Sequence, residues 1–231
     1  MHEVIDQHFV EGIMRNNDEI AEHNHEHFDE LGFFTINLMS APGAGKTTLL
    51  AATIPALRSD YSAVVIEGDM VGELDADRLR AQNIISFQIS TGRSCHLDAS
   101  MIDRLLHTAP LSPEFDFLFI ENVGNLVCPA EFPLGEHQRV VLLSVTEGAD
   151  KPLKYPVIFR NCDAVIFTKS DLLPYVDFDL DKAIEYVHDI NPNAQTFAVS
   201  VKNGDGLQEW FSWLKSQIRV YKESHVHLAA R

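Results

Sequence analysis

The apolar residues of this chain gather in seven short runs that are separated by turns and by stretches with helical spacing. The runs cover residues 33–39, 63–66, 84–89, 115–120, 140–145, 164–168 and 197–199. Strands that are apolar on both faces are typical of a sheet that helices cover on both sides, and the connections are long enough for a helix between successive strands. The pattern therefore predicts an α/β domain on a mainly parallel sheet of about seven strands.

The two ends of the chain have a different pattern. Residues 1–31 are polar and acidic, and their apolar residues have a spacing that predicts one or two helices lying on a core: Val4, Ile5, Phe9, Ile13, Ile20 and Phe28. No apolar period remains after residue 221, so we expect the chain to fray there. We therefore divide the chain into an N-terminal helical extension (1–31), one domain (32–221) and a C-terminal tail (222–231).

Composition and charge limit the classes of partner. The chain has 231 residues, of which 45% are hydrophobic, and its 18 Lys and Arg against 34 Asp and Glu give a formal net charge of −16. This charge repels phosphate backbones and anionic lipids, so we expect neither nucleic acid nor a membrane as a partner. Without a long apolar run or a signal-peptide pattern, we expect a cytoplasmic protein. Its three cysteines predict thiols rather than a disulfide framework.

A glycine-rich segment follows the first predicted strand and leads into a helical stretch. It reads Ser40-Ala41-Pro42-Gly43-Ala44-Gly45-Lys46-Thr47-Thr48. Such a turn wraps backbone N–H groups around a phosphate, while Lys46 neutralises charge and the Thr47 hydroxyl binds Mg²⁺. Ser40 stands where a P-loop usually has its first glycine. We expect residues 41–48 to bind nucleotide; the alternative is an ordinary glycine-rich turn between a strand and a helix.

Acidic residues stand at the ends of the second and fourth predicted strands. They are Asp69, in Glu-Gly-Asp, and Glu121, in Glu-Asn-Val-Gly. The carboxyl ends of the strands face the crevice where an α/β sheet binds its ligand, so either carboxylate can hold Mg²⁺ and serve catalysis together with Lys46. The N–H of Gly124 can bind the γ-phosphate. Each carboxylate taken alone could equally be a helix cap or part of a solvated turn.

Two strings near the last two predicted strands resemble the base-recognition elements of GTPases. The first reads Thr168-Lys169-Ser170-Asp171 and the second Ser200-Val201-Lys202, where GTPases usually have Asn-Lys-x-Asp and Ser-Ala-Lys. A carboxylate at Asp171 accepts hydrogen bonds from N1–H and the N2 amine of guanine, whereas it repels the N1 lone pair of adenine. The methylene stems of Lys169 and Lys202 can lie along base and ribose. We therefore expect GTP rather than ATP.

Three longer strings resemble the HypB family: residues 91–99 (TGRSCHLDA), 121–130 (ENVGNLVCPA) and 144–156 (SVTEGADKPLKYP). The resemblance runs from about residue 32 to residue 213. It implies a GTPase of the SIMIBI class of P-loop NTPases, which dimerise around nucleotide, with a role in inserting nickel into [NiFe]-hydrogenase. The implied partners are a second copy of the chain, in a nucleotide- and metal-dependent homodimer, and a nickel-enzyme precursor or a second nickel maturation protein.

The resemblance also implies metal-binding residues. Cys95, His96 and Cys128 match the metal ligands of the GTPase domain, and two thiolates with an imidazole suit Ni²⁺ or Zn²⁺ better than Mg²⁺. Taken by spacing alone, the two cysteines could be core residues and the histidine a turn residue. Cys162 has no such partner and is expected to be structural. Asp75 lies in a segment that relatives fill with acidic residues, and it either contributes to metal binding or the dimer surface or caps a helix.

Two features of the family are absent from the N-terminal residues. Many relatives carry a Cys-x-x-Cys-Gly-Cys motif or a long histidine tract, and this chain has only His23, His25 and His27 there. Because His23 and His27 share a helix face they could bind a metal weakly, but a solvated polar face is the preferred interpretation.

Three alternative functions remain at this point. The first is a related GTPase for urease maturation, which has much of the same layout. The second is a P-loop kinase for a small molecule, which would transfer phosphate to an acceptor, whereas a GTPase hydrolyses GTP alone. The third is a GTP-binding scaffold without turnover.

Overall fold

A seven-stranded parallel sheet forms the centre of the molecule. The computed structural model describes the backbone of residues 5–69, 78–92 and 94–229, and within these the side chains of residues 11–225. The strands are β1 (Phe34–Ser40), β2 (Ala63–Asp69), β3 (Ile85–Ser90), β4 (Phe117–Glu121), β5 (Gln138–Ser144), β6 (Ala164–Thr168) and β7 (Gln195–Val199). Their order is β3-β2-β4-β1-β5-β6-β7, and every neighbouring pair is parallel. The predicted sheet is confirmed, and each apolar run lies on one strand.

The burial of each strand follows its position in this order. All residues of β1, β4 and β6 are buried, whereas the edge strands β3 and β7 are mostly half-exposed. A central strand of a parallel sheet is covered on both faces, which is why these sequences are continuously apolar rather than alternating.

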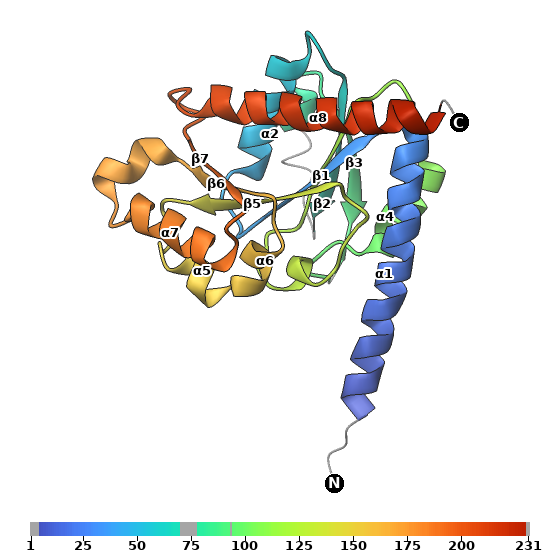
Figure 1. Cartoon of the computed structure of the whole chain (residues 1–231), viewed down its shortest axis with the longest axis horizontal. Helices are drawn as coiled ribbons and strands as arrows, with labels where there is room; N and C mark the ends of the chain where they lie inside the picture. The colour runs from blue at the N-terminus through green and yellow to red at the C-terminus, as the bar shows by residue number, and fades with distance from the viewer. Residues whose placement is uncertain (1–4, 70–77, 93, 230–231) are drawn as a thin grey trace.

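Helices cover both faces of the sheet (Figure 1). The helices α2 (Lys46–Leu57) and α8 (Leu207–Ala229) pack on one face in a shared apolar core. On the other face, α6 (Pro156–Arg160) and α7 (Leu180–Ile190) cover β5 and β6, while α4 (Ala99–Thr108) covers β2 and β4. Short elements complete the fold: α5 (Lys151–Lys154) and the 3₁₀ turns η1 (Cys128–Ala130) and η2 (Ser170–Tyr175).

The N-terminal extension is one continuous helix, α1 (Ile5–Leu31), that packs beside α4. Phe28 lies in the core, and the fully buried Asn24 donates hydrogen bonds from Nδ2 to the carbonyl oxygens of Ala99 and Leu134. The expectation that apolar residues lie on the core along the whole segment is wrong at Ile13, which is 44% exposed. Figure 1 shows the reason, because the first half of α1 extends past the edge of the domain.

The expected fraying after residue 221 is also wrong, because α8 continues to Ala229. Contacts with distant parts of the chain replace the missing apolar period. Lys222 pairs with Asp116, and His225 Nε2 lies 3.0 Å from Asp29 Oδ1. A local sequence pattern does not predict contacts between residues that are so far apart in the sequence. Within the described residues, no helix has the length and apolar character needed to cross a bilayer.

Candidate nucleotide and metal site

The predicted nucleotide-binding segments all leave the sheet at one edge. Since every strand is parallel, the chain after β1, β2, β4, β6 and β7 emerges at the same, carboxyl-terminal side. The P-loop follows β1, Asp69 ends β2, and Glu121 ends β4. This topology brings together residues that are far apart in the sequence.

The P-loop backbone has the conformation that its glycines allow. Gly45 caps the N-terminus of α2 with a φ of 100°, a left-handed conformation that disfavours side chains. Ser40, in place of the usual first glycine, is accommodated because it is the last residue of β1 and is buried there. Its Oγ accepts a hydrogen bond from Lys46 Nζ at 2.9 Å. The departure from the usual P-loop sequence therefore keeps the lysine beside the loop.

A cavity of about 450 Å³, here called the phosphate cavity, lies against this loop and is lined by residues 42–43 and 45–48. Within it, Thr47 Oγ1 donates a hydrogen bond to Glu121 Oε1 at 2.7 Å, and Asp69 also lines the wall. Gly124 approaches the loop so closely that a Cβ there would lie 2.8 Å from Pro42 Cα. The predicted hydroxyl, both carboxylates and the glycine thus line one cavity. Of the expected P-loop residues, Ala41 packs instead against an apolar core.

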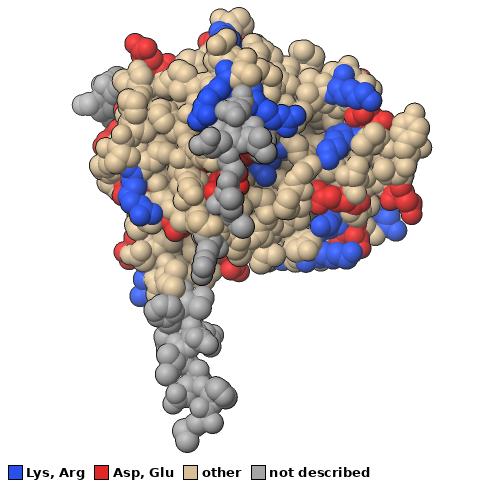
Figure 2. Space-filling model, turned by 180° about the vertical axis from the view of Figure 1, so that it is seen from behind, with Lys and Arg blue, Asp and Glu red and all other residues tan. Residues whose placement is uncertain are grey.

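Sequence reasoning missed some of the lining. Arg78, which follows residues outside the described part of the chain, reaches this cavity, as do Glu67 and Asn122. Arg78 belongs to no sequence motif, so its position in the cavity wall could be found only from the tertiary structure. Figure 2 shows several Lys and Arg side chains gathered on one part of the surface, although the chain has a net charge of −16. Cations near a phosphate cavity favour an anionic ligand.

A second cavity, of about 320 Å³, lies on the other side of the P-loop. Thr168 and Val199 are paired on the neighbouring strands β6 and β7, so the two strings that follow them converge here. Asp171 Oδ1 accepts a hydrogen bond from Ser200 Oγ at 2.8 Å, which fixes the carboxylate. Val201 provides apolar lining. The predicted base-recognition residues are therefore neighbours in space.

Two further residues of these strings form hydrogen bonds with the backbone of the P-loop, beside the second cavity. Lys169 has a φ of 59°, and its Nζ donates to the carbonyl oxygen of Gly43 at 2.8 Å. Thr168 Oγ1 donates to the carbonyl oxygen of Ala44 at 2.6 Å. Lys202 Nζ lies 3.9 Å from Asp171 Oδ2. One continuous surface thus leads from the carboxylate of Asp171 to the phosphate cavity.

Two cysteines and a histidine form a cluster near the phosphate cavity. The Sγ atoms of Cys95 and Cys128 are 3.2 Å apart, and Cys95 Sγ lies 3.9 Å from His96 Nδ1. The three ligand atoms all lie within 4.8 Å of one another. Bonds of about 2.3 Å to sulfur and about 2.0 Å to nitrogen would therefore fit a Ni²⁺ or Zn²⁺ ion after small side-chain adjustments.

The two kinds of ligand in this cluster differ in protonation. The hydrogen bond with Cys95 and partial burial hold the pKa of the Cys128 thiol above its usual value, so this thiol has to release its proton when it binds a metal ion. Burial lowers the pKa of His96, which keeps the imidazole neutral with a lone pair to donate. The buried Cys162 differs, since burial raises its pKa to about 12 and its Sγ donates to the carbonyl oxygen of Phe159.

A short chain segment joins the phosphate cavity to the cysteine cluster. It runs from Glu121 to Cys128, and two asparagines on it form hydrogen bonds with the backbone near Cys95 and His96. Asn122 Oδ1 accepts from the backbone N–H of Leu97 at 3.2 Å, next to His96. Asn125 Nδ2 donates to the carbonyl oxygen of Cys95 at 3.3 Å. A movement of this segment would therefore reach both sites. Asp75 lies outside the described residues.

The parallel sheet, the glycine-rich turn after β1 and the phosphate cavity define the class of protein, a P-loop NTPase. The chain belongs to the CobW/HypB/UreG family, whose nucleotide-binding domain model matches residues 34–198, and within that family it is similar to HypB proteins. The resemblance noted in the sequence is confirmed.

Individual relatives agree with this assignment. The hydrogenase maturation factor HypB of Azotobacter chroococcum is 46% identical over 205 residues, covering 89% of this chain and 67% of that protein. The hydrogenase/urease maturation factor HypB of Helicobacter pylori is 41% identical over 220 residues, covering 94% and 90%. The crystal structure of Helicobacter pylori HypB in complex with nickel has a TM-score of 0.84 at 40% identity, covering 89% of this chain and 96% of that chain.

Proposed function

We propose that this protein is a Mg²⁺-dependent GTPase that carries nickel and assists its insertion into [NiFe]-hydrogenase. The segment between Glu121 and Cys128 carries the proposal, because it joins a phosphate cavity to a soft metal-ligand set. In this mechanism Cys95, His96 and Cys128 hold Ni²⁺ or Zn²⁺. The γ-phosphate orders the segment at Gly124, and hydrolysis releases it, which alters the metal geometry.

The residues proposed to hold Mg²⁺ lie around the phosphate position. Thr47 and Glu121 are joined by a hydrogen bond, and Asp69 lines the same cavity. Hydroxyl and carboxylate oxygens together with water and phosphate are the usual ligands of Mg²⁺. Lys46 and the backbone of residues 42–48 would bind the phosphates, and Asp171 would bind guanine. Asp75 remains a proposed contributor to metal binding or to the dimer surface.

The test combines GTP turnover with measurement of molecular size. We expect slow hydrolysis of GTP in the absence of any phosphate acceptor. We also expect a dimer with a non-hydrolysable GTP analogue, more dimer when Ni²⁺ or Zn²⁺ is added, and less with GDP. Since coupling is reciprocal for binding, the analogue should raise metal affinity by the same factor by which metal raises analogue affinity.

Each failure in this experiment has a distinct meaning. Binding of GTP without turnover would support a non-catalytic scaffold, and transfer of phosphate to a small acceptor would support a kinase. Equal metal affinity with GDP and with the analogue would remove the proposed coupling. Because two relatives are named for both hydrogenase and urease maturation, a urease precursor is the control client in assays of nickel transfer.

Base choice is predicted to depend on Asp171. In the Asp171→Asn variant, an amide donor replaces one of the two acceptors for guanine and matches the C2 carbonyl of xanthine. Loss of a hydrogen bond to a charged group is worth about 1.5–3 kcal/mol, so we expect GTP affinity to fall roughly tenfold to a hundredfold while affinity for xanthosine triphosphate rises.

The exposed Asp177 provides a matched control for this measurement. Asp177→Asn removes the same charge a few residues away and should leave both affinities unchanged. An unaltered preference for guanine in Asp171→Asn would show that another residue recognises the base.

A further inference from the structure

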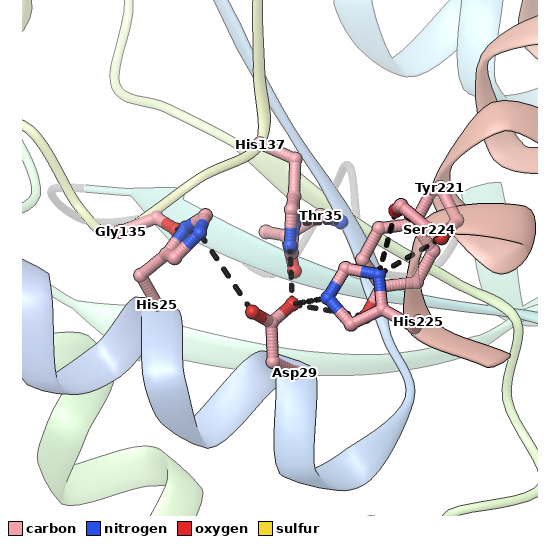
Figure 3. A network of polar contacts seen from close by, with 8 residues as sticks. All are labelled: His25, Asp29, Thr35, Gly135, His137, Tyr221, Ser224 and His225. Atoms are coloured by element: carbon pink, nitrogen blue, oxygen red, sulfur yellow. Dashed lines mark hydrogen bonds and ion pairs between the residues drawn. The ribbon is translucent and has the colours of Figure 1, made fainter. Parts of the chain in front are cut away.

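The three histidines near the N-terminus lie on two different sides of α1. His25 points toward Asp29 and His137, in the network that Figure 3 shows between α1, the chain before β5 and α8. The ring of His27 lies instead beside the ring of His107 on α4, and the ring of His23 neighbours that of His27 on α1. The sequence pairs His23 with His27 on one face, but only the structure adds a third imidazole from a different helix.

The network around Asp29 resembles a metal site but is satisfied by hydrogen bonds. Asp29 Oδ1 accepts from His137 Nε2 at 2.9 Å and from the Tyr221 hydroxyl at 3.1 Å, and it also contacts His225 (Figure 3). The backbone N–H of Thr35 donates to His137 Nδ1, so the neutral ring carries its proton on Nε2. Metal binding there would require loss of that proton or of the Thr35 hydrogen bond. We therefore regard this network as structural.

The rings of His23, His27 and His107 lie at separations close to those of imidazoles that share a metal ion. The ring centroids of His23 and His27 are 6.2 Å apart, and those of His27 and His107 are 5.4 Å apart. Two imidazoles that bind one metal ion through bonds of about 2.0 Å have their centroids roughly 5 Å apart. His27 is the common member of both pairs, and rotation of the side chains would bring each pair to that distance. The packing of α1 on α4 holds the two helices at the required separation.

The hydrogen bonding and electrostatics of His107 favour a cation. Its Nδ1 donates to the carbonyl oxygen of Asp103 at 2.8 Å, which leaves the lone pair on Nε2. Donation of the second ring N–H to a carbonyl is the usual arrangement of a metal-binding histidine. His107 also lies in the last turn of α4, at the negative end of the helix dipole, and its side chain is 57% exposed.

We propose that His23, His27 and His107 form a second site for a divalent transition-metal ion such as Ni²⁺ or Zn²⁺, on the surface between α1 and α4. Neutral imidazoles favour these ions over Mg²⁺ and Ca²⁺. The site is separate from the cysteine cluster, because α4 begins three residues after His96 and carries His107 in its last turn, about 12 Å further along the helix. Its existence does not depend on the proposed GTPase activity.

The decisive experiment measures Ni²⁺ binding to the full chain in a Cys95→Ala, Cys128→Ala background, from which two of the three cysteine-cluster ligands are absent. Equilibrium dialysis should still detect one bound equivalent. We expect His27→Gln and His107→Gln each to lower its affinity at least tenfold. His23→Gln should also weaken binding. Co²⁺ spectra of the unsubstituted protein should show thiolate charge-transfer absorption for the first equivalent and none for the second.

Matched controls separate this site from the alternatives. His25→Gln changes a neighbouring histidine on the same helix and should leave the equivalent in place. Loss of binding in that variant would place the metal in the Asp29 network and overturn the proposal. Unchanged affinity in His107→Gln would also overturn it, because α4 would then contribute no ligand. His107 is a surface residue, so its variant should keep the thermal unfolding midpoint, which verifies that folding is intact.

Discussion

Replacing Lys46 with alanine should abolish tight GTP binding and hydrolysis. The Lys46 side chain is largely buried and held beside the P-loop by Ser40 Oγ, so its ammonium group is already positioned before nucleotide arrives. Loss of a preorganised charged hydrogen bond to phosphate costs about 3 kcal/mol, which corresponds to at least a hundredfold weaker binding. Isothermal titration with GTP and Mg²⁺ would measure the change.

The exposed Lys182 on α7 provides the matched control. Lys182→Ala removes the same charge far from the cavity and should bind GTP as the parent does. A thermal unfolding curve for each variant verifies folding, since Lys46 begins α2. If Lys46→Ala binds and hydrolyses GTP as well as the parent, the assignment of the P-loop is wrong.

Removing both thiols of the cysteine cluster should eliminate tight metal binding while guanine-nucleotide binding stays largely intact. In the Cys95→Ala, Cys128→Ala variant only His96 remains of the three ligands. Complete Zn²⁺ sites built from cysteine and histidine are worth about 10 kcal/mol or more, so loss of two ligands should remove over ~4 kcal/mol, or roughly a thousandfold in affinity. Competition with a chelator of known affinity distinguishes this tight equivalent from the weaker histidine site.

Cys162→Ala serves as the control for this experiment. Its thiol is buried in the core before β6, whereas the metal-ligand set follows the carboxyl ends of β3 and β4, so the variant should lose some stability and keep its tightly bound metal. The assignment would be refuted if the double cysteine variant kept that equivalent while a variant without His23, His25 and His27 lost it. The metal would then belong to the N-terminal histidines.

The sequence alone determined most of the fold, because a parallel sheet covered on both faces needs continuous apolar strands. The seven runs predicted all seven strands, and the buried sequences of β1, β4 and β6 explain why. The positions of the P-loop string and of the Thr168-Lys169-Ser170-Asp171 string could also be predicted from the sequence, since each stands at the carboxyl end of a predicted strand. Local chemistry was sufficient wherever a motif was contiguous.

Only the tertiary structure decided what depends on contacts between distant segments. Helix α8 continues past residue 221, where its residues pair with Asp116 and Asp29. Ile13 of α1 is exposed because the helix extends past the domain there. The tertiary structure brought Arg78 to the phosphate cavity and His107 to the histidines of α1. Neither residue belongs to a motif, and their role arises from packing between segments that are far apart in the sequence, which hydrophobic periodicity and local spacing do not encode.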